Sequence, residues 1–229
     1  MKSTLLILTT LFTLSSTLCA DLTKSLAVLD FTNNSLIKKD EFGTLSKGIA
    51  EMLITELSQI TSLMVVERQQ LKSMVEEIQL SQSGLIDEES QLAVGKMVGA
   101  QYLVLGSYMV AFGDKIRLDS RIVHVETGRT IKAAKAEGQT KKILELISNL
   151  TKTILQNLDV KLTKDERKSL DRKDDLSIEA VTAFSKGIDA EDQGDINTAK
   201  TFYRQALELD SEFQAAKKRL KKLNSKKIF

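Results

Sequence analysis

The sequence holds few side chains that could carry out chemistry. His124 is the only histidine and Cys19 the only cysteine among 229 residues. A metal cluster or a histidine-activated nucleophile needs further groups of these kinds. The glycines are scattered and form neither GxGxxG nor GxxxxGK[ST], so no phosphate-binding loop is visible. We therefore expect no enzyme activity, no metal site and no cofactor.

Two short features remain as candidate sites. With regular strand alternation His124 shares a face with Leu118 and Ile122, which predicts a partly buried histidine whose hydrogen bonds are satisfied. Glu67 and Arg68 directly follow a predicted strand and are candidate partner-contact residues. An adjacent acid and base at a strand end also fits a structural or surface ion pair, and this second interpretation is favoured.

The first 20 residues have the pattern of an export signal. Lys2 gives a positive start, Leu5–Leu14 form a short apolar stretch, and Ser15–Ala20 supply a small-residue cleavage region. The mature chain is expected to begin near Asp21. No later stretch has the roughly 20 apolar residues that a membrane-spanning helix needs, so we expect no transmembrane helix in the mature chain.

Cys19 lies beside this cleavage region and is a lipidation candidate. A bacterial lipoprotein signal places a small residue before the cysteine that takes the lipid, whereas Leu18 precedes Cys19 here. The alternative is a cysteine that is removed together with the signal peptide. No intramolecular disulfide can form from one cysteine.

Apolar periodicity and turn residues predict the order of elements after the signal. Strands are expected at 26–31, 63–66, 102–112, 116–125 and 129–138, and helices at 42–60, 69–80 and 143–158. A further short helix is expected to begin at a cap formed by Asp87 or Ser90 and to end before Gly99. Gly113-Asp114 and Thr127-Gly128 are the expected hairpin turns. The predicted fold class is α/β (an α+β sandwich), a mixed sheet with flanking helices.

Four segments are expected along the chain. They are a signal peptide at 1–20, an α/β domain at 21–158, a charged linker at 159–176, and a helical hairpin with a basic C-terminal helix at 177–229. The linker is rich in charge, shows little apolar rhythm and contains no proline, which predicts a solvated or partly helical connector.

The α/β segment resembles the CsgG family of envelope proteins. Five motifs stand in that family's order: LAVLDF at 26–31, VVERQQL at 65–71, SGLIDEES at 83–90, GAQYLVLGS at 99–107 and RIVHVETGRTI at 121–131. The resemblance implies a fold shared with curli secretion lipoproteins and with soluble relatives resembling FlgO, LpoB and the N-terminal domain of TolB. It also implies a protein that is not an enzyme.

The pore-forming branch of that family adds two long membrane hairpins, each needing about twenty extra residues. Only two residues lie between Phe112 and Lys115, and only two between Gly138 and the helix expected near Lys141. This departure puts a channel function in doubt.

The C-terminal segment resembles a tetratricopeptide repeat over 180–211. Small residues and one aromatic occur at the spacing of that motif, at Ala183, Gly187, Ala190, Ala199, Tyr203 and Ala206. Such residues let two antiparallel helices approach closely. Because about three repeats are needed for a free-standing solenoid, one hairpin must pack on something, and Phe213 and Leu220 suggest a third, capping helix.

The net charge of +2 conceals a basic tail, because residues 217–229 hold seven Lys or Arg and no acid. The candidates for contact with anionic lipid or an acidic envelope polymer are Lys217, Lys218, Arg219, Lys221 and Lys222. A helix C-terminus that favours cations is the structural explanation. Export argues against nucleic acid as a partner.

These features predict an exported accessory or assembly protein, periplasmic or associated with the outer membrane, that acts through protein contacts without catalysis. The expected partner is an envelope protein machine or a second copy of the chain, as a homo-oligomer. The alternative is a subunit of a curli-type outer-membrane secretion channel.

Overall fold

The computed structural model describes residues 23–37, 39–40, 42–81, 88–112, 114–171 and 176–225. The expected signal peptide and Cys19 therefore lie outside the described residues, as do Asp87 and Gly113. None of the helices in the described ranges is long and apolar enough to cross a membrane.

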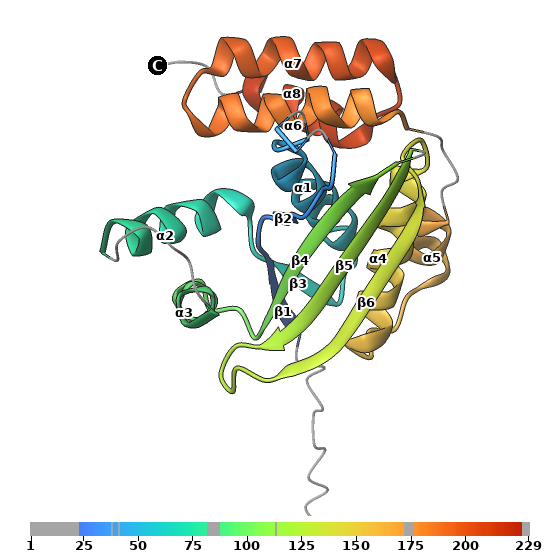
Figure 1. Cartoon of the computed structure of the whole chain (residues 1–229). Helices are drawn as coiled ribbons and strands as arrows, with labels where there is room; N and C mark the ends of the chain where they lie inside the picture. Colours follow the sequence, from blue (N-terminus) through green and yellow to red (C-terminus); the bar gives the residue numbers. More distant parts are fainter. Residues whose placement is uncertain are drawn as a thin grey trace, which may run out of the picture.

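The described secondary structure consists, in chain order, of β1 (Lys24–Val28), β2 (Thr32–Asn33), α1 (Leu45–Leu57), β3 (Leu63–Val65), α2 (Arg68–Ser81), α3 (Glu88–Met97), β4 (Tyr102–Ala111), β5 (Lys115–His124), β6 (Thr130–Gln139), α4 (Ile143–Asn157), α5 (Lys164–Leu170), α6 (Ile178–Asp192), α7 (Ile196–Leu209) and α8 (Gln214–Ser225). The predicted mixed sheet with flanking helices and a C-terminal helical part is confirmed (Figure 1).

The sheet has the strand order β3-β1-β4-β5-β6, with the short β2 also paired to β4. β1 runs parallel to both β3 and β4, whereas β4, β5 and β6 form an antiparallel meander. β1 is buried on both faces, as a central parallel strand requires. Its Leu26 and Val28 join the cluster beneath α1 and α4, and Ala27 joins the smaller cluster beneath α2 and α3.

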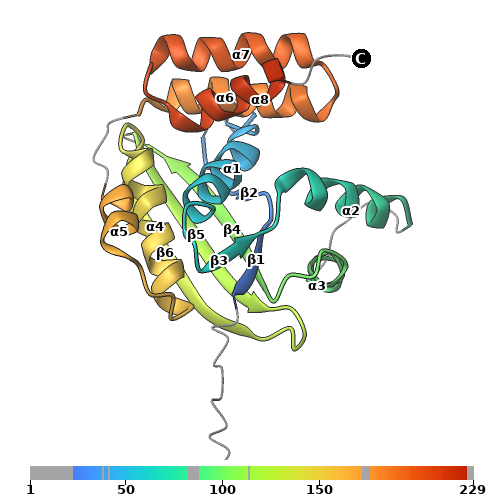
Figure 2. The same cartoon turned by 180° about the vertical axis from the view of Figure 1, so that it is seen from behind.

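Helices cover the two faces of the sheet unequally. α1, α4 and α5 lie on one face (Figure 2), and the buried residues of this side form the larger hydrophobic cluster. On the other face α2 and α3 stand at the β1 side, so the meander's surface is not covered by a helix there (Figure 1). This asymmetry creates the groove described below.

α1 is the central helix of the molecule. It is buried nearly all round, including Ile49 and Leu53, because the sheet lies against one side and α6 and α8 against the other. At Gly48 the two helices α1 and α6 meet so closely that an added Cβ would lie 1.8 Å from the hydroxyl of Ser185. The C-terminal helices therefore share one continuous hydrophobic cluster with the sheet.

The segment between α4 and α6 differs from a solvated connector. It contains α5, whose N-terminus has a capping box between Thr163 and Glu166, and it buries Leu170 and Leu176. Two backbone N–H groups and the Thr61 hydroxyl bond Glu166 and lower its pKa to about 2. The high charge of this segment belongs to its outer surface, and the helical part of the expectation is met.

Most other predicted elements agree with the structure to within two residues. The helix expected at 42–60 is shorter and spans Leu45–Leu57, because residues 42–44 and 58–59 form turns. The connections that follow β4 and β6 are short, as predicted: β5 begins at Lys115 and α4 at Ile143.

Candidate docking groove

A groove lies between α2 and the uncovered face of the meander. It is a hollow of about 970 Å³, within the range of pockets that take ligands or partner side chains. α2 forms an apolar wall with Leu71 and Val75, and Leu105 of β4 continues it. The groove therefore has an apolar inner side and a wide entrance.

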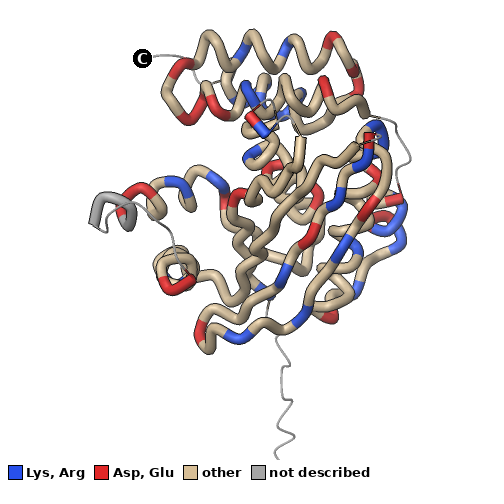
Figure 3. The backbone as a smooth tube through the Cα atoms, viewed as in Figure 1, with Lys and Arg blue, Asp and Glu red and all other residues tan. Residues whose placement is uncertain are grey.

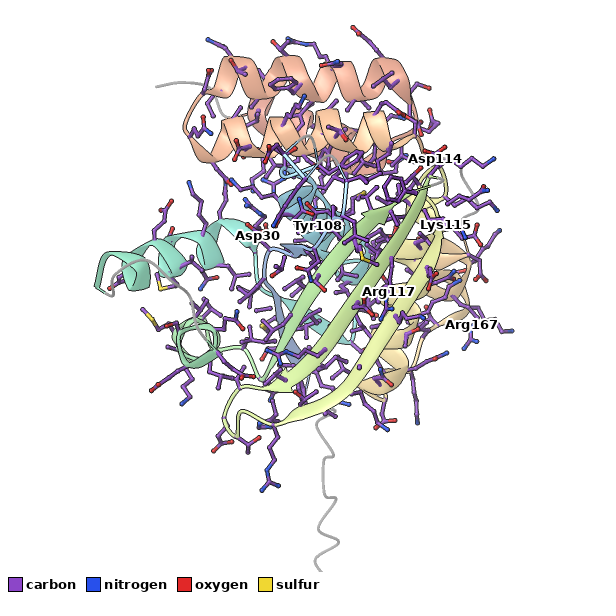
Figure 4. All side chains as sticks on the ribbon, viewed as in Figure 1. Asp30, Tyr108, Asp114, Lys115, Arg117 and Arg167 are labelled. Atoms are coloured by element: carbon purple, nitrogen blue, oxygen red, sulfur yellow. The ribbon has the colours of Figure 1, made fainter. Side chains whose placement is uncertain are left out.

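The strands place polar and charged side chains along the other side of the groove. Ser107, Asp119 and Lys135 are direct neighbours across β4, β5 and β6, and they share the face of Leu105. In Figure 3 basic and acidic residues alternate along β5 and β6, and Figure 4 shows Arg117 on this face of β5. Arg117 binds Asp119 through two bonds of 2.7 Å.

The position of the groove follows from the chain path. β1 lies between β3 and β4; the chain reaches β3 through α1 on one face and β4 through α2 and α3 on the other. The carboxyl ends of strands at such a switch in direction leave a crevice in which ligands commonly bind. Asp30 follows β1 and Arg68 follows β3, and both line the groove (Figure 4 labels Asp30).

Asp30 faces the groove because the next residue, Phe31, turns into the core. The Phe31 ring is fully buried and occupies the space in which a Cβ of residue 106 would lie, at 2.4 Å. Gly106 thus leaves room for the Phe31 ring, and with Phe31 turned inward the Asp30 carboxylate stays at the surface.

Arg68 does not pair with its neighbour Glu67, so the expected pair is not formed. Its guanidinium is buried and holds Asp30 at 3.2 Å and Asp192 of α6 at 2.8 Å. Burial by itself would lower the pKa of Arg68, but the bonds to Asp192 and the charges of both carboxylates outweigh it and raise that pKa. Glu67 is exposed and lies 4.0 Å from Lys222 of α8.

Asp192 is the acceptor on which several cations converge at one end of the groove. Arg68 and Lys47 bind its carboxylate, the latter at 3.0 Å, and Lys72 donates to its backbone carbonyl. Burial would raise the pKa of Asp192, yet the two cations lower it overall. This end of the groove is therefore built jointly by α1, α2 and α6.

The basic tail is only partly a surface feature. Arg219, predicted to contact an anionic surface, is instead buried and binds Glu51 of α1 at 2.9 Å and Glu191 of α6 at 3.3 Å. Tyr203 donates to Glu191 at 2.7 Å, and burial with the Glu191 charge raises the pKa of Tyr203. The prediction for Arg219 was wrong because its apparent surface helix packs on α1.

The four lysines of the predicted set lie differently. Lys217 pairs with Glu212 at 3.1 Å, and Lys222 lies near Glu67. Lys218 and Lys221 are exposed. Their contact with anionic lipid or polymer stays a prediction.

His124 lies opposite Tyr102 on β4, and the two rings meet edge to face at 5.5 Å. Partial burial agrees with the prediction. The prediction that the hydrogen bonds of His124 are satisfied is wrong, because its Nδ1 is buried and has no hydrogen-bond partner among the described residues. No group of three or more His, Cys, Asp or Glu in the described ranges could hold a metal ion.

The six small and aromatic residues predicted to pack the C-terminal hairpin lie at or near the α6–α7 interface, and all are buried. They are Ala183, Gly187, Ala190, Ala199, Tyr203 and Ala206. Phe184 packs against the rings of Tyr203 and Phe213.

Sequence reasoning missed Asp30, Lys47, Glu51 and Asp192. Asp30 had a visible signal, an acid at the end of a buried strand. Glu51 had one too, because it interrupts an otherwise buried helix and so indicates a buried ion pair. Lys47 and Asp192 had none, since their pairing depends on how α6 docks on α1.

Comparison with known proteins finds a family match over part of the chain. Residues 8–117 match the family model "Curli production assembly/transport component CsgG". The predicted CsgG-family resemblance is confirmed for this part of the chain. Four of the five motifs fall inside the matched range, and RIVHVETGRTI at 121–131 falls outside it.

Solved structures overlap the chain only in part. The LpoB C-terminal domain from Salmonella enterica is 24% identical, with a TM-score of 0.40 over 52% of this chain and 84% of that one. Lipoprotein GNA1162 from Neisseria meningitidis is 13% identical, with a TM-score of 0.42 over 61% and 99%. The PelC dodecamer from Paraburkholderia phytofirmans is 12% identical, with a TM-score of 0.35 over 62% and 91%.

One curated relative carries an enzyme name. "Putative adenylate cyclase 3" of Rhizobium meliloti (strain 1021) is 28% identical over 156 residues, which are 68% of this chain. The chain spans about a quarter of that protein's length, 24%.

The Asp192 pairing gives a pH-dependent prediction. Asp192→Asn removes the buried acceptor that Arg68 and Lys47 share and leaves them, among the described residues, only the more exposed Asp30 and Asp189 as counter-ions. It should lower the free energy of unfolding by about 2 kcal/mol at pH 7. Because the folded pKa of Asp192 is lowered, this contribution is complete above the unfolded value of about 3.9 and is lost as pH falls through the folded pKa.

Urea unfolding of the wild-type protein and of Asp192→Asn between pH 3 and 7 measures this contribution. The difference between their free energies of unfolding should be constant above about pH 5 and should become smaller below about pH 4. Asp119→Asn, which removes an exposed pair, is the matched control and should change stability by less than about 1 kcal/mol. A loss of stability in Asp192→Asn no larger than that in Asp119→Asn would contradict the role of Asp192 as a buried acceptor.

Proposed function

We propose that this protein is an exported accessory or assembly protein of the cell envelope that binds a protein partner in the groove and has no catalytic activity. The observation that carries the proposal is the groove itself, with an apolar wall on one side and paired charges on the other. An apolar inner surface with a polar rim is the usual composition of a protein-binding surface.

The family match supports the envelope role, since the matched model is named for curli assembly and transport. We place the protein in the periplasm on the strength of that match and of the predicted export signal. Membrane attachment through Cys19 and contact of Lys218 and Lys221 with anionic lipid belong to the same proposal.

The C-terminal helices help to build the proposed binding surface. We take α6 and α7 to be a tetratricopeptide-like hairpin whose missing neighbours are replaced by α1 on one side and α8 on the other. Its packing residues, α1 contacts and single occurrence fit this role. In the proposed binding mode, α6 contributes Asp192 to the end of the groove.

The partner segment is expected to be amphipathic. It would set apolar side chains against Leu71, Val75 and Leu105, and it would align polar groups with Asp119 and Lys135 on the strands. A purely charged peptide would leave the apolar wall wet and would gain little from burial.

Absence of catalysis has a direct test, given the relative named as a cyclase. Purified protein incubated with ATP and either Mg²⁺ or Mn²⁺ should form no cyclic AMP above a protein-free blank. Activity that survives repurification and is lost in His124→Ala would overturn this part of the proposal.

Binding in the groove is tested by site-directed photo-cross-linking in living cells. A photoreactive residue replaces Asn34, which lines the groove and is exposed. We expect one dominant protein adduct, identified by mass spectrometry. Adding Ser107→Trp, which fills the groove, should remove that adduct because the indole occupies the partner's space.

Lys168→Trp is the matched control, because it adds the same side chain to exposed α5 on the other face of the sheet. It should leave the adduct unchanged. An adduct that resists Ser107→Trp, or that is lost equally with Lys168→Trp, would show that the groove is not the binding surface.

A further inference from the structure

β6 is a long strand at the edge of the sheet. It is ten residues long and, within the described part of the chain, pairs only with β5, and most of its residues are exposed. Such an edge offers unpaired amides and carbonyls to any strand that approaches. The opposite edge strand, β3, has only three residues.

The alternation of hydrogen bonds between β5 and β6 shows which residues of β6 turn their backbone groups toward the open edge. Thr140 N–H donates to the Asp114 carbonyl at 2.8 Å, so residues 114 and 140 form a hydrogen-bonded pair. In an antiparallel ladder such pairs alternate with pairs whose backbone groups point away. The β6 residues that turn their N–H and C=O to the open edge are therefore Ala133, Lys135, Glu137 and Gln139.

A second contact agrees with this alternation. The Asn157 side chain of α4 donates to the Ala133 carbonyl at 3.4 Å from the edge side. The Gln139 carbonyl is also used, by the N–H of Lys142. Among the described residues, no backbone hydrogen bond reaches the outward groups of Lys135 or Glu137.

Charge makes this edge complementary to itself. Lys135 and Glu137 lie on one face and pair within the strand at 3.3 Å, both half-exposed. If two β6 strands run antiparallel about a twofold axis at Ala136, Lys135 lies directly opposite Glu137 of the second copy. That pair is formed twice, since a twofold interface repeats every contact.

The backbone fits the same register. Lys135 and Glu137 both turn their amides and carbonyls outward, so each Lys135–Glu137 pair across the axis can exchange two N–H···O bonds. A register shifted by one residue would bring the inward groups of Ala136 opposite outward ones and would lose these bonds. Charge and hydrogen bonding thus select one register.

We propose that two copies of this chain associate through β6, antiparallel and centred on Ala136, so that their sheets become continuous. Lys135 also lines the groove, whereas Glu137 does not. The pairing uses the backbone edge of β6, and the inference does not depend on the proposed function. The second copy is preferred to a foreign strand because β6 itself supplies, in one register, both the opposite charges and the outward backbone groups.

Analytical ultracentrifugation over a range of concentrations tests the pairing. The wild-type protein should show a monomer–dimer equilibrium. Lys135→Glu and Glu137→Lys each place like charges opposite one another twice, and each should weaken dimerisation about tenfold or more. An equimolar mixture of these two variants should dimerise again, because an acidic edge then meets a basic one.

Two further variants separate this mechanism from a general effect of charge or folding. Glu179→Lys makes the same charge change at an exposed residue of α6 and should dimerise like wild type. Glu137→Pro removes an outward N–H that the β5 ladder does not use, and it should weaken dimerisation while circular dichroism keeps its native form.

The proposal would be overturned by a wild-type protein that is monomeric at every concentration, by a dimer that Glu137→Lys leaves intact, or by a mixture of the two charge variants that stays monomeric. Slowed amide exchange at Lys135 and Glu137 only upon addition of another envelope protein would likewise assign the edge to a foreign strand.

Discussion

The burial of α1 between two layers is the constraint on which the rest of the molecule depends. The sheet covers one side of this helix and α6 with α8 covers the other, so an apolar surface runs almost completely around it. A helix of this kind cannot be left half-covered in water without a large loss of hydrophobic stabilisation. The C-terminal helices are thus part of the core, and a single helical hairpin finds here the packing surface that it lacks alone.

The buried ion pairs decide where those helices sit. Arg219 reaches Glu51 and Glu191, and Arg68 reaches Asp192, in surroundings that are nearly closed to water. Desolvation offsets much of the attraction in such pairs, so we assign them a positioning role beyond their small net stability. They fix α6 and α8 against α1 and α2, and this places Asp192 at the end of the groove.

The elements of the α/β part were predictable because each depends on local periodicity and turn residues. The apolar run LAVLDF predicts a buried strand that ends next to an acid. The turn residue Gly128 and the alternating apolar residues predict the meander. The tail was not predictable in the same way. Its lysines and Arg219 look alike in sequence, and only the docking of α8 on α1 separates a buried guanidinium from exposed amines. The same holds for Arg68, whose partner lies 124 residues away.

Native-state hydrogen exchange tests most directly the claim that the sheet, α1 and the C-terminal helices form one cooperative body. The account predicts that the slowest amides of α1, α6 and β4 exchange with the same free energy and the same urea dependence, because all three open only when the whole protein unfolds. Exchange of α6 to α8 at a clearly lower free energy, with α1 and the sheet still protected, would contradict it and would make the helical hairpin a separately opening module.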